Sequence, residues 1–394
     1  MECIKVSFIG DIMCEMPFLK AAKTKGNYDF EEAFIELKNL FGNSDYVIGN
    51  LETVCAGEKQ KYTHELYSFN TPDSFISALH RCGIDFVSTA NNHCLDRGID
   101  GLKRTLEVLD ANNIEHTGTY RSRDEAEKPC IVNVNGLKIG IVAFTYGTNS
   151  NINGVVLNDQ ELFHVNLLQK QVFTSDDSFL GKVKGLASVE TKTKIKRLLG
   201  RPYKNISVDN MPNGFDLEYL SSLSAAIERT KENADYTICL LHCGGQFNTQ
   251  PGEYSEYMMD FLKEKGVDSI IGNHPHIVQK SQLLRNGIAT YCLGNVSISP
   301  SSIYVPMENL PDYSIAVHLY FGKTDKCLKK ITASVLKIIE DSNGYLRIVP
   351  MNNLYDKNND EILMVNTKKI LECFTQIRFE RIEMQEEWDL CYPG

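Results

Sequence analysis

Short apolar runs recur along the chain, and each run stops at a cluster of polar residues. The runs are rich in β-branched residues and short enough to form buried strands. Six segments of this kind are "KVSFIG" (5–10), "DYVIGN" (45–50), "DFVSTA" (85–90), "YTICLL" (236–241), "DSIIG" (268–272) and "ATYCLG" (289–294).

Helical patterns lie between these runs. In the segment 71–83, Pro72 stands in the first turn and Gly83 can close the helix. Apolar residues at helical spacing predict further helices at 98–113, around 220–227 and at 253–266. Strands that alternate with helices in this way indicate an α/β sandwich rather than an all-β barrel.

Two segments depart from this alternation. Residues 148–212 are polar with little periodicity, which predicts an insertion or lid. After residue 323 the pattern becomes that of a hairpin with an Asn-Gly turn signal at 343–344, followed by a short helix at 368–378. We therefore predict a core domain at 1–322 and a β-rich C-terminal extension with a terminal helix at 323–394.

Composition excludes several classes of protein. The 394 residues are 42% hydrophobic, as in an ordinary globular protein, and carry a net charge of −10 without a basic cluster. The charge argues against binding to nucleic acid or to an anionic membrane surface. No window approaches the roughly 18 apolar residues of a membrane-spanning helix, so we predict no membrane segment in this chain.

The cysteines bear on the compartment. The twelve cysteines are scattered, form no CxxC pair and often lie inside apolar runs. This distribution is typical of small buried residues in a reducing compartment and not of a disulfide framework. We predict a cytoplasmic protein; the alternative is an extracellular, membrane-associated protein whose N-terminal anchor has been trimmed.

Polar residues that can carry chemistry follow the predicted strands. In open α/β sheets, ligands bind beyond the carboxyl ends of the strands, so these residues are candidates for one site. They are Asp11, Asn50, Glu52, Asn91, Asn92, His93, His242, Asn273, His274, His276 and Asn295.

The donor types in this set favour a metal centre. Carboxylate, carboxamide and imidazole groups suit Mn, Zn or Fe, and their number is enough for two divalent ions with open positions. A single Asp or Asn after a strand is usually a turn or cap residue, but six strand ends of this kind in one chain favour a shared site. The remaining histidines are interpreted as surface or core residues: His64, His80, His116, His164 and His318.

The ordered motifs resemble a known family. The set "FIGD", "GNLET", "ANNHCLDRG", "LLHCGG", "GNHPHIVQ" and "YCLGN" is similar to CapA/PgsA-type capsule biosynthesis proteins, which are associated with poly-γ-glutamate synthesis and related to calcineurin-like metallophosphoesterases. The resemblance covers roughly residues 4–296, apart from 148–212. It implies a four-layer α/β/β/α sandwich with two metal ions where the two sheets meet.

The resemblance also implies roles for single residues. Asp11 matches the first metal carboxylate, and Asn92 matches the asparagine ligand of the phosphoesterase "GNH" motif. His93 is similar to the histidine that acts there as general acid or oxyanion stabiliser. By the same resemblance, His242 and His274 bind one ion and His276 binds the other.

Departures from the pattern matter as much. Phosphoesterases of this kind begin with "DxH", whereas Met13 stands at the histidine position here. Asn50 occupies the place of their bridging aspartate, and we predict that Glu52 rather than Asn50 supplies the bridging charge, because two neighbouring dications repel each other.

A further departure concerns the capsule family's "HWGxEY" motif. This chain has "HCGGQF", so Gln246 replaces the glutamate, and Glu253 lies nearby at the wrong spacing for a direct exchange. We expect Gln246 and Glu253, like Asn50, Asn91 and Asn295, to support the ligands or to contact substrate.

These interpretations predict a metal-dependent hydrolase that cleaves a phosphoester with a metal-bound hydroxide and is linked to capsule or poly-γ-glutamate biosynthesis. The metals would supply the positive charge for an anionic small-molecule or polymer substrate. One alternative is a non-catalytic accessory protein for capsule polymer assembly or export. The other is a metal-dependent hydrolase of γ-glutamyl amide bonds.

Overall fold

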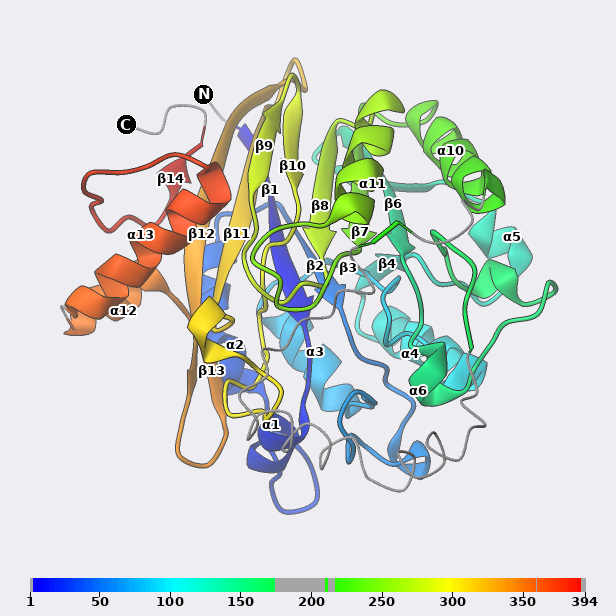
Figure 1. The fold of residues 1–394 in the computed structure, drawn as a ribbon, viewed down its shortest axis with the longest axis horizontal. Helices are drawn as coiled ribbons and strands as arrows, with labels where there is room; N and C mark the ends of the chain where they lie inside the picture. Colours follow the sequence, from blue (N-terminus) through cyan, green and yellow to red (C-terminus); the bar gives the residue numbers. More distant parts are fainter. Residues whose placement is uncertain (1–2, 174–209, 212–216, 359, 391–394) are drawn as a thin grey trace.

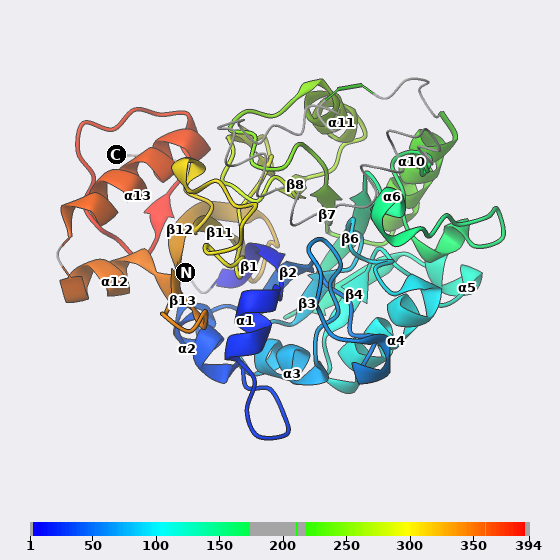
Figure 2. The same ribbon diagram turned by 60° about the horizontal axis from the view of Figure 1, so that its bottom comes forward.

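The computed structural model describes residues 3–173, 210–211, 217–358 and 360–390. Two β-sheets pack face to face, and helices cover their outer faces (Figure 1, Figure 2). The predicted four-layer α/β/β/α sandwich is confirmed. Among the described residues, no helix is both long and apolar enough to cross a membrane.

The first sheet has the strand order β13-β12-β11-β1-β2-β3-β4, with β14 paired to β12. Neighbouring strands from β1 to β4 are parallel, whereas β11, β12 and β13 are antiparallel to their neighbours. The strands are β1 (Cys3–Ile12), β2 (Tyr46–Leu51), β3 (Phe86–Ser88), β4 (Glu115–Thr117), β11 (Tyr313–Gly322), β12 (Leu328–Glu340), β13 (Leu346–Pro350) and β14 (Trp388–Asp389).

The second sheet has the order β5-β6-β7-β8-β10-β9. Its four central strands are parallel, and the edge strands β5 and β9 run antiparallel to their neighbours. The strands are β5 (Cys130–Val134), β6 (Leu137–Thr145), β7 (Tyr236–His242), β8 (Ser269–Asn273), β9 (Ser281–Leu284) and β10 (Gly287–Thr290).

Helices form the outer layers. Figure 2 shows α2 (Glu31–Phe41), α3 (Asp73–Arg81) and α4 (Gly98–Ala111) along the first sheet, with α10 (Leu217–Lys231) and α11 (Glu253–Glu264) on the opposite side of the molecule. The other helices are α1 (Met16–Ala21), α5 (Arg123–Ala126), α6 (Ser150–Asn153), α12 (Met351–Asn358), α13 (Glu361–Thr375) and the 3-10 turns η1 (Glu58–Gln60), η2 (Leu162–His164) and η3 (Met307–Asn309).

Three apolar clusters fill the spaces between the four layers. Successive side chains of a strand point to opposite faces, so Ile238 and Leu240 of β7 lie in the cluster between the sheets. Their neighbours Cys239 and Leu241 pack toward α10 and α11. A third cluster joins the first sheet to α2, α3 and α4. The continuous apolar runs of the sequence are therefore strands covered on both faces.

The predicted helices are confirmed with small shifts at their ends. The pattern at 71–83 forms α3, which ends at Arg81, two residues before Gly83, where φ is +100°. Pro72 precedes the first turn as the N-cap and does not lie within it as predicted. The patterns at 98–113, around 220–227 and at 253–266 form α4, α10 and α11. The terminal helix predicted at 368–378 is α13, which begins earlier, at Glu361, where Asp360 caps its N-terminus.

The C-terminal residues extend the first sheet. β12 pairs with β11 along its length and turns into β13 through the predicted Asn-Gly turn, in which Gly344 has a φ of +86°. The division into a core domain and an extension at residue 323 stays a prediction. Most of the insertion or lid predicted at 148–212 lies outside the described residues; α6 and η2 belong to its described part.

The two sheets meet at the carboxyl end of β1. The Asp11 amide donates to the Gly294 carbonyl at 3.0 Å, and the Val296 amide donates to the Asp11 carbonyl at 2.8 Å. A Cβ atom on Gly10 would lie 1.9 Å from the Gly294 carbonyl oxygen, so only glycine fits there. This contact brings the strand ends of both sheets to one place.

Candidate metal centre

The carboxyl ends of β1, β2, β7 and β8 bring five predicted metal ligands together. Each of the five side chains is at most 1% exposed, although all are carboxylates or imidazoles. They are Asp11, Glu52, His242, His274 and His276. Such groups are almost never fully buried unless they are paired or bind a ligand.

Glu52 lies at the centre of this group. Its Oε1 atom is 3.5 Å from Nε2 of His242, 3.7 Å from Nε2 of His276 and 4.0 Å from Nε2 of His93. Two sets of side chains have ligand atoms close enough to hold an ion: one contains Asp11, Glu52 and His242, and the other contains Glu52, His274 and His276. Glu52 belongs to both sets, so its carboxylate lies where it would bridge two ions.

His274 lies close to both of the other histidines. One candidate set groups it with His276 and Glu52, and its ring centroid lies 4.7 Å from that of His242, so the pairing of His274 with His242 that the resemblance implies stays a prediction. His274 has a φ of +100° and His276 a φ of +61°, conformations that are uncommon for residues other than glycine. The turn around Pro275 therefore brings both imidazoles to the same side of the chain.

The hydrogen bonding of Glu52 and His274 fits a bound cation. Among the described residues, neither Glu52 oxygen and neither His274 ring nitrogen has a hydrogen-bond partner. Burial and the nearby Asp11 carboxylate raise the pKa of Glu52 well above its usual range. Burial and the neighbouring His242 lower the pKa of His274 well below its usual range. Unpartnered buried groups of this kind are costly, and divalent ions would satisfy both.

The ring of His276 is oriented by contacts at its Nδ1 atom, the nitrogen that faces away from Glu52. Its Nδ1 atom is 2.9 Å from Asn295 Oδ1 and 3.1 Å from Asp11 Oδ2, which leaves Nε2 toward Glu52. Burial alone would raise the pKa of Asp11, but the bond to His276 holds it below its usual range. Asn295 thus orients a candidate ligand, as buried partners of metal-binding histidines do.

His242 is held by two asparagines. Its Nε2 atom is 2.7 Å from Asn92 Oδ1, and its Nδ1 atom is 3.1 Å from the Asn50 side-chain amide. That amide also donates to Asp11 Oδ1 at 2.7 Å. Burial lowers the pKa of His242 to about 3, so the imidazole is neutral, the form that binds metals.

His93 forms a buried pair with Asp96. Its Nδ1 atom is 2.7 Å from Asp96 Oδ2, which also accepts the Phe69 amide at 2.6 Å. Its Nε2 atom faces Glu52 and lies 3.4 Å from the Asn149 side-chain amide. Neither Asp96 nor Asn149 was among the predicted site residues; the spacing H-x-x-D within "NHCLD" is the signal that could have indicated Asp96.

Comparison with known proteins supports one family. The family model described as "Bacterial capsule synthesis protein PGA_cap" matches residues 5–300, which include every residue of the candidate centre. The chain belongs to the PGA_cap family. The match ends before β11, so the C-terminal strands and helices of this PGA_cap protein lie outside it.

Two curated relatives and one solved structure are similar to this PGA_cap chain. The capsule biosynthesis protein CapA of Bacillus anthracis is 23% identical over 75% of the chain, and the PGA biosynthesis protein CapA of Bacillus subtilis is 22% identical over 75% of it. The chain covers 59% and 63% of their lengths. A structure described as a novel phosphatase from Mycoplasma pneumoniae is 12% identical, with a TM-score of 0.41 over 86% of this chain and 94% of its own.

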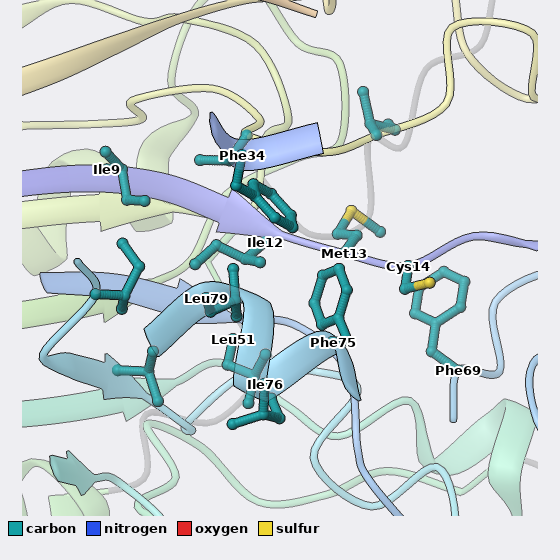
Figure 3. Close-up of a cluster of buried hydrophobic side chains, with 14 of the residues drawn as sticks. Ile9, Ile12, Met13, Cys14, Phe34, Leu51, Phe69, Phe75, Ile76 and Leu79 are labelled. Atoms are coloured by element: carbon teal, nitrogen blue, oxygen red, sulfur yellow. The ribbon is translucent and has the colours of Figure 1, made fainter. Parts of the chain in front are cut away.

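In this PGA_cap chain, Met13 stands at the position of the "DxH" histidine and packs in the hydrophobic core. The side chain is 1% exposed and belongs to the apolar cluster beneath the first sheet. Figure 3 shows it beside Phe75 and Cys14. The Met13 backbone forms two hydrogen bonds with the Ser297 hydroxyl. This position contributes to the hydrophobic core and offers no ligand.

Three further residues predicted for the PGA_cap centre, Asn91, Gln246 and Glu253, differ in their surroundings. Asn91 donates to the Leu51 carbonyl at 2.7 Å and accepts the His93 amide at 3.0 Å, so it shapes the loop that carries His93. Gln246 is buried, and the ring of its neighbour Phe247 lies 5.7 Å from the His276 ring. Glu253 is exposed in the first turn of α11, outside the buried cluster.

Proposed function

We propose that this protein is a metal-dependent hydrolase and that its substrate is a phosphoester. The observation that carries the proposal is the buried Glu52 carboxylate, which lacks a hydrogen-bond partner among the described residues and lies within 4.0 Å of three imidazole nitrogens. When bound, two divalent ions would supply positive charge against a phosphoryl group and lower the pKa of a water molecule.

The residues that would hold the ions follow from the two sets. Asp11, Glu52 and His242, with Asn92 beside His242, would hold one ion, and Glu52, His274 and His276 would hold the other. Imidazole, carboxylate and amide donors suit Mn, Zn or Fe. Asn50 and Asn295 would orient Asp11, His242 and His276 through the hydrogen bonds described above.

His93 is suited to proton transfer. Asp96 accepts a hydrogen bond from Nδ1, which fixes the ring and directs Nε2 toward the site. A proton held at Nε2 would pass to the leaving alkoxide, or Nε2–H would stabilise the charge that develops on the phosphoryl oxygens. Asp96 acts through His93 and is a positioning residue.

The net charge of the chain does not oppose an anionic substrate. The chain carries −10 overall, and the two ions would supply positive charge where the substrate binds. Membership of the PGA_cap family and the printed names of the CapA relatives support a role in capsule or poly-γ-glutamate biosynthesis. We therefore propose a small anionic metabolite or an anionic polymer of that process as substrate.

A metal and activity assay tests the proposal. The purified protein is expected to contain up to two transition-metal ions per chain and to hydrolyse phosphomonoesters or phosphodiesters with added manganese. His93→Ala should reduce turnover without loss of metal. The matched control is His64→Ala, at an exposed histidine, which should leave both turnover and metal content unchanged. Absence of bound metal, or full activity of His93→Ala, would contradict the proposal.

Two substitutions favour a second candidate function. Met13 provides no ligand, and Gln246 replaces a glutamate of the capsule family while Glu253 lies outside the cluster. A non-catalytic protein that binds capsule polymer through its metals would tolerate both changes. Polymer binding that requires manganese and proceeds without turnover would support this function, and release of glutamate from γ-glutamyl peptides would instead indicate an amide hydrolase.

The cysteines support a reducing, cytoplasmic compartment as part of this proposal. Most of the described cysteines are buried free thiols, including Cys14, Cys55 and Cys94. Burial raises the pKa of the Cys55 and Cys94 thiols above their usual range, which keeps them protonated and unreactive. Retention of activity in millimolar reductant, with full thiol titration only after unfolding, is the expected behaviour.

A further inference from the structure

The five candidate ligands are buried, but two residues that approach them are partly exposed. Tyr146 and Asn149 are half-buried, whereas the five candidate ligands are at most 1% exposed. Both belong to the segment that connects β6 to α6. A substrate that approaches the centre past this segment meets these two side chains.

Backbone hydrogen bonds hold the segment next to the metal ligands. The Tyr146 amide donates to the carbonyl of His242 at 3.0 Å. Thr148 is buried, its carbonyl accepts the Asn153 side-chain amide at 2.6 Å, and its hydroxyl accepts from the Gln171 amide. The first bond ties the segment to the end of β7, and the two Thr148 bonds stabilise the loop itself. We call residues 146–149 the wall of the site.

The Tyr146 ring forms one part of this wall. Its centroid lies 4.6 Å from that of His274 and 6.4 Å from that of His242, to which it is nearly parallel at 10°. The ring restricts the space above the two imidazoles. Three residues further along the same segment, the Asn149 side chain provides a polar group.

Asn149 has a left-handed backbone conformation and caps the N-terminus of α6. Its φ of +51° and ψ of +34° lie in the left-handed region, where asparagine is tolerated better than most residues. Its carbonyl accepts the Ile152 amide at 2.7 Å and so begins α6, which glycine would do equally well. The backbone conformation alone therefore does not explain why the residue is asparagine.

The Asn149 side chain reaches the nitrogen of His93 that faces the centre. Its Nδ2 atom lies 3.4 Å from His93 Nε2. In neutral His93, whose Nδ1–H donates to Asp96, Nε2 carries a lone pair toward which the Asn149 amide donates. When His93 is protonated for proton transfer, Nε2 becomes a donor and the Asn149 amide is free to bind a substrate oxygen. A hydrogen bond of this length is weak. The Asn149 amide can therefore exchange His93 for a substrate oxygen as its acceptor with little loss of free energy.

We propose that Asn149 is a substrate-binding residue whose side-chain amide donates a hydrogen bond to a phosphoryl oxygen held between His93 and the metal ligands. The proposal rests on the proposed function and adds a named donor for the anion. A neutral amide suits this place because it donates to an anionic oxygen without forming a salt bridge with the Glu52 carboxylate, which lies 4.0 Å from the same His93 nitrogen.

Two variants separate the amide from the conformation. Asn149→Gly removes the donor and favours the left-handed conformation, so the wall should remain folded. Asn149→Asp keeps the shape and places a negative charge against the phosphoryl group. The matched control is Asn113→Gly, since Asn113 is an exposed asparagine with a similar φ of +56°.

The measurements are calorimetric titration of manganese-loaded protein with inorganic phosphate, and kcat and KM for a phosphoester. We expect phosphate to bind about 10- to 100-fold more weakly to Asn149→Gly, the range for one hydrogen bond to a charged group, and still more weakly to Asn149→Asp. The manganese content and the phosphate affinity of Asn113→Gly should equal those of the wild type.

Unchanged phosphate affinity and unchanged kcat/KM in both Asn149 variants would overturn the proposal. Failure of the proposed function looks different: the wild-type protein would bind manganese and phosphate but hydrolyse no ester. In that case the phosphate titration alone decides the role of Asn149. A wild-type protein that binds manganese but no phosphate contradicts both proposals.

Discussion

The Nδ1 atom of His93 lies 2.7 Å from the Oδ2 atom of Asp96, and both side chains are buried. Asp96 is therefore placed to fix the His93 ring and to direct Nε2 toward Glu52. The same carboxylate oxygen accepts the Phe69 amide, so the pair is anchored to the backbone on one side and faces the candidate centre on the other.

Asp96→Asn tests this pair. The change keeps the size of the side chain but removes its charge, so His93 loses its fixed tautomer and orientation. We expect turnover to fall about 10- to 100-fold, the usual effect of losing such a partner, with metal content unchanged. Asp100→Asn, at an exposed position in the first turn of α4, is the control and should behave as the wild type. Equal turnover of both variants would argue against the pair.

Glu52→Gln should have opposite effects on stability with and without metal. Without metal, the change replaces a buried acidic group that has no hydrogen-bond partner among the described residues, so the variant should unfold at a higher temperature than the wild type. With manganese, the wild type should become the more stable, because only its carboxylate compensates two cations. Thermal melts in chelator and in manganese measure both effects, and a variant that gains as much from manganese as the wild type would contradict a bridging role.

Met13→Ala and Met13→His test the position at which "DxH" proteins carry a ligand. Because Met13 packs in the apolar cluster of Figure 3, Met13→Ala should lower the free energy of unfolding by about 2–5 kcal/mol. Met13→His should also destabilise the fold and should not raise the metal content. The partly exposed Met307 provides the control, since Met307→Ala should cost much less. Increased metal affinity of Met13→His would show that the position faces the centre after all.

Glu15 predicts a pH dependence of stability. It accepts hydrogen bonds from the Ser299 amide and the Tyr304 hydroxyl, and burial raises its pKa from 4.5 to about 7. Between these two values the folded protein binds more protons than the unfolded chain, so stability should fall as the pH rises from about 4.5 to 7. Glu15→Gln removes this dependence and should be the more stable protein at pH 8, by an amount on the order of 3 kcal/mol.

Urea unfolding of the metal-free protein at pH 5 and pH 8 measures this effect of Glu15. Glu232→Gln, at an exposed position, should unfold like the wild type at both pH values. If the difference between wild type and Glu15→Gln is the same at the two pH values, the Glu15 carboxyl does not titrate in this range.

Much of the centre could be predicted from the sequence because of the geometry of parallel sheets. The carboxyl ends of parallel strands lie at one edge, so residues that follow β1, β2, β7 and β8 had to lie close together once the sheets were in contact. Charge predicts Glu52 rather than Asn50 as the bridging residue. In the structure Glu52 lies in both ligand sets, whereas Asn50 donates to Asp11 and approaches His242.

Other features depend on contacts that no local pattern encodes. Asp96 follows His93 at turn spacing, and an aspartate in a turn is usually a cap. Asn149 lies at the start of a segment whose polar composition predicted only an insertion or lid. The addition of β12 to β11, and the grouping of His274 with His276, depend on how distant segments pair and on backbone conformations at single residues.

Anomalous diffraction from crystals soaked in manganese tests the central claim most directly. The account predicts two anomalous peaks about 3.5–4 Å apart, one on each side of Glu52, with His242 beside one peak and with His274 and His276 beside the other. The absence of a peak at the strand ends, or a single peak that Glu52 does not contact, would contradict it.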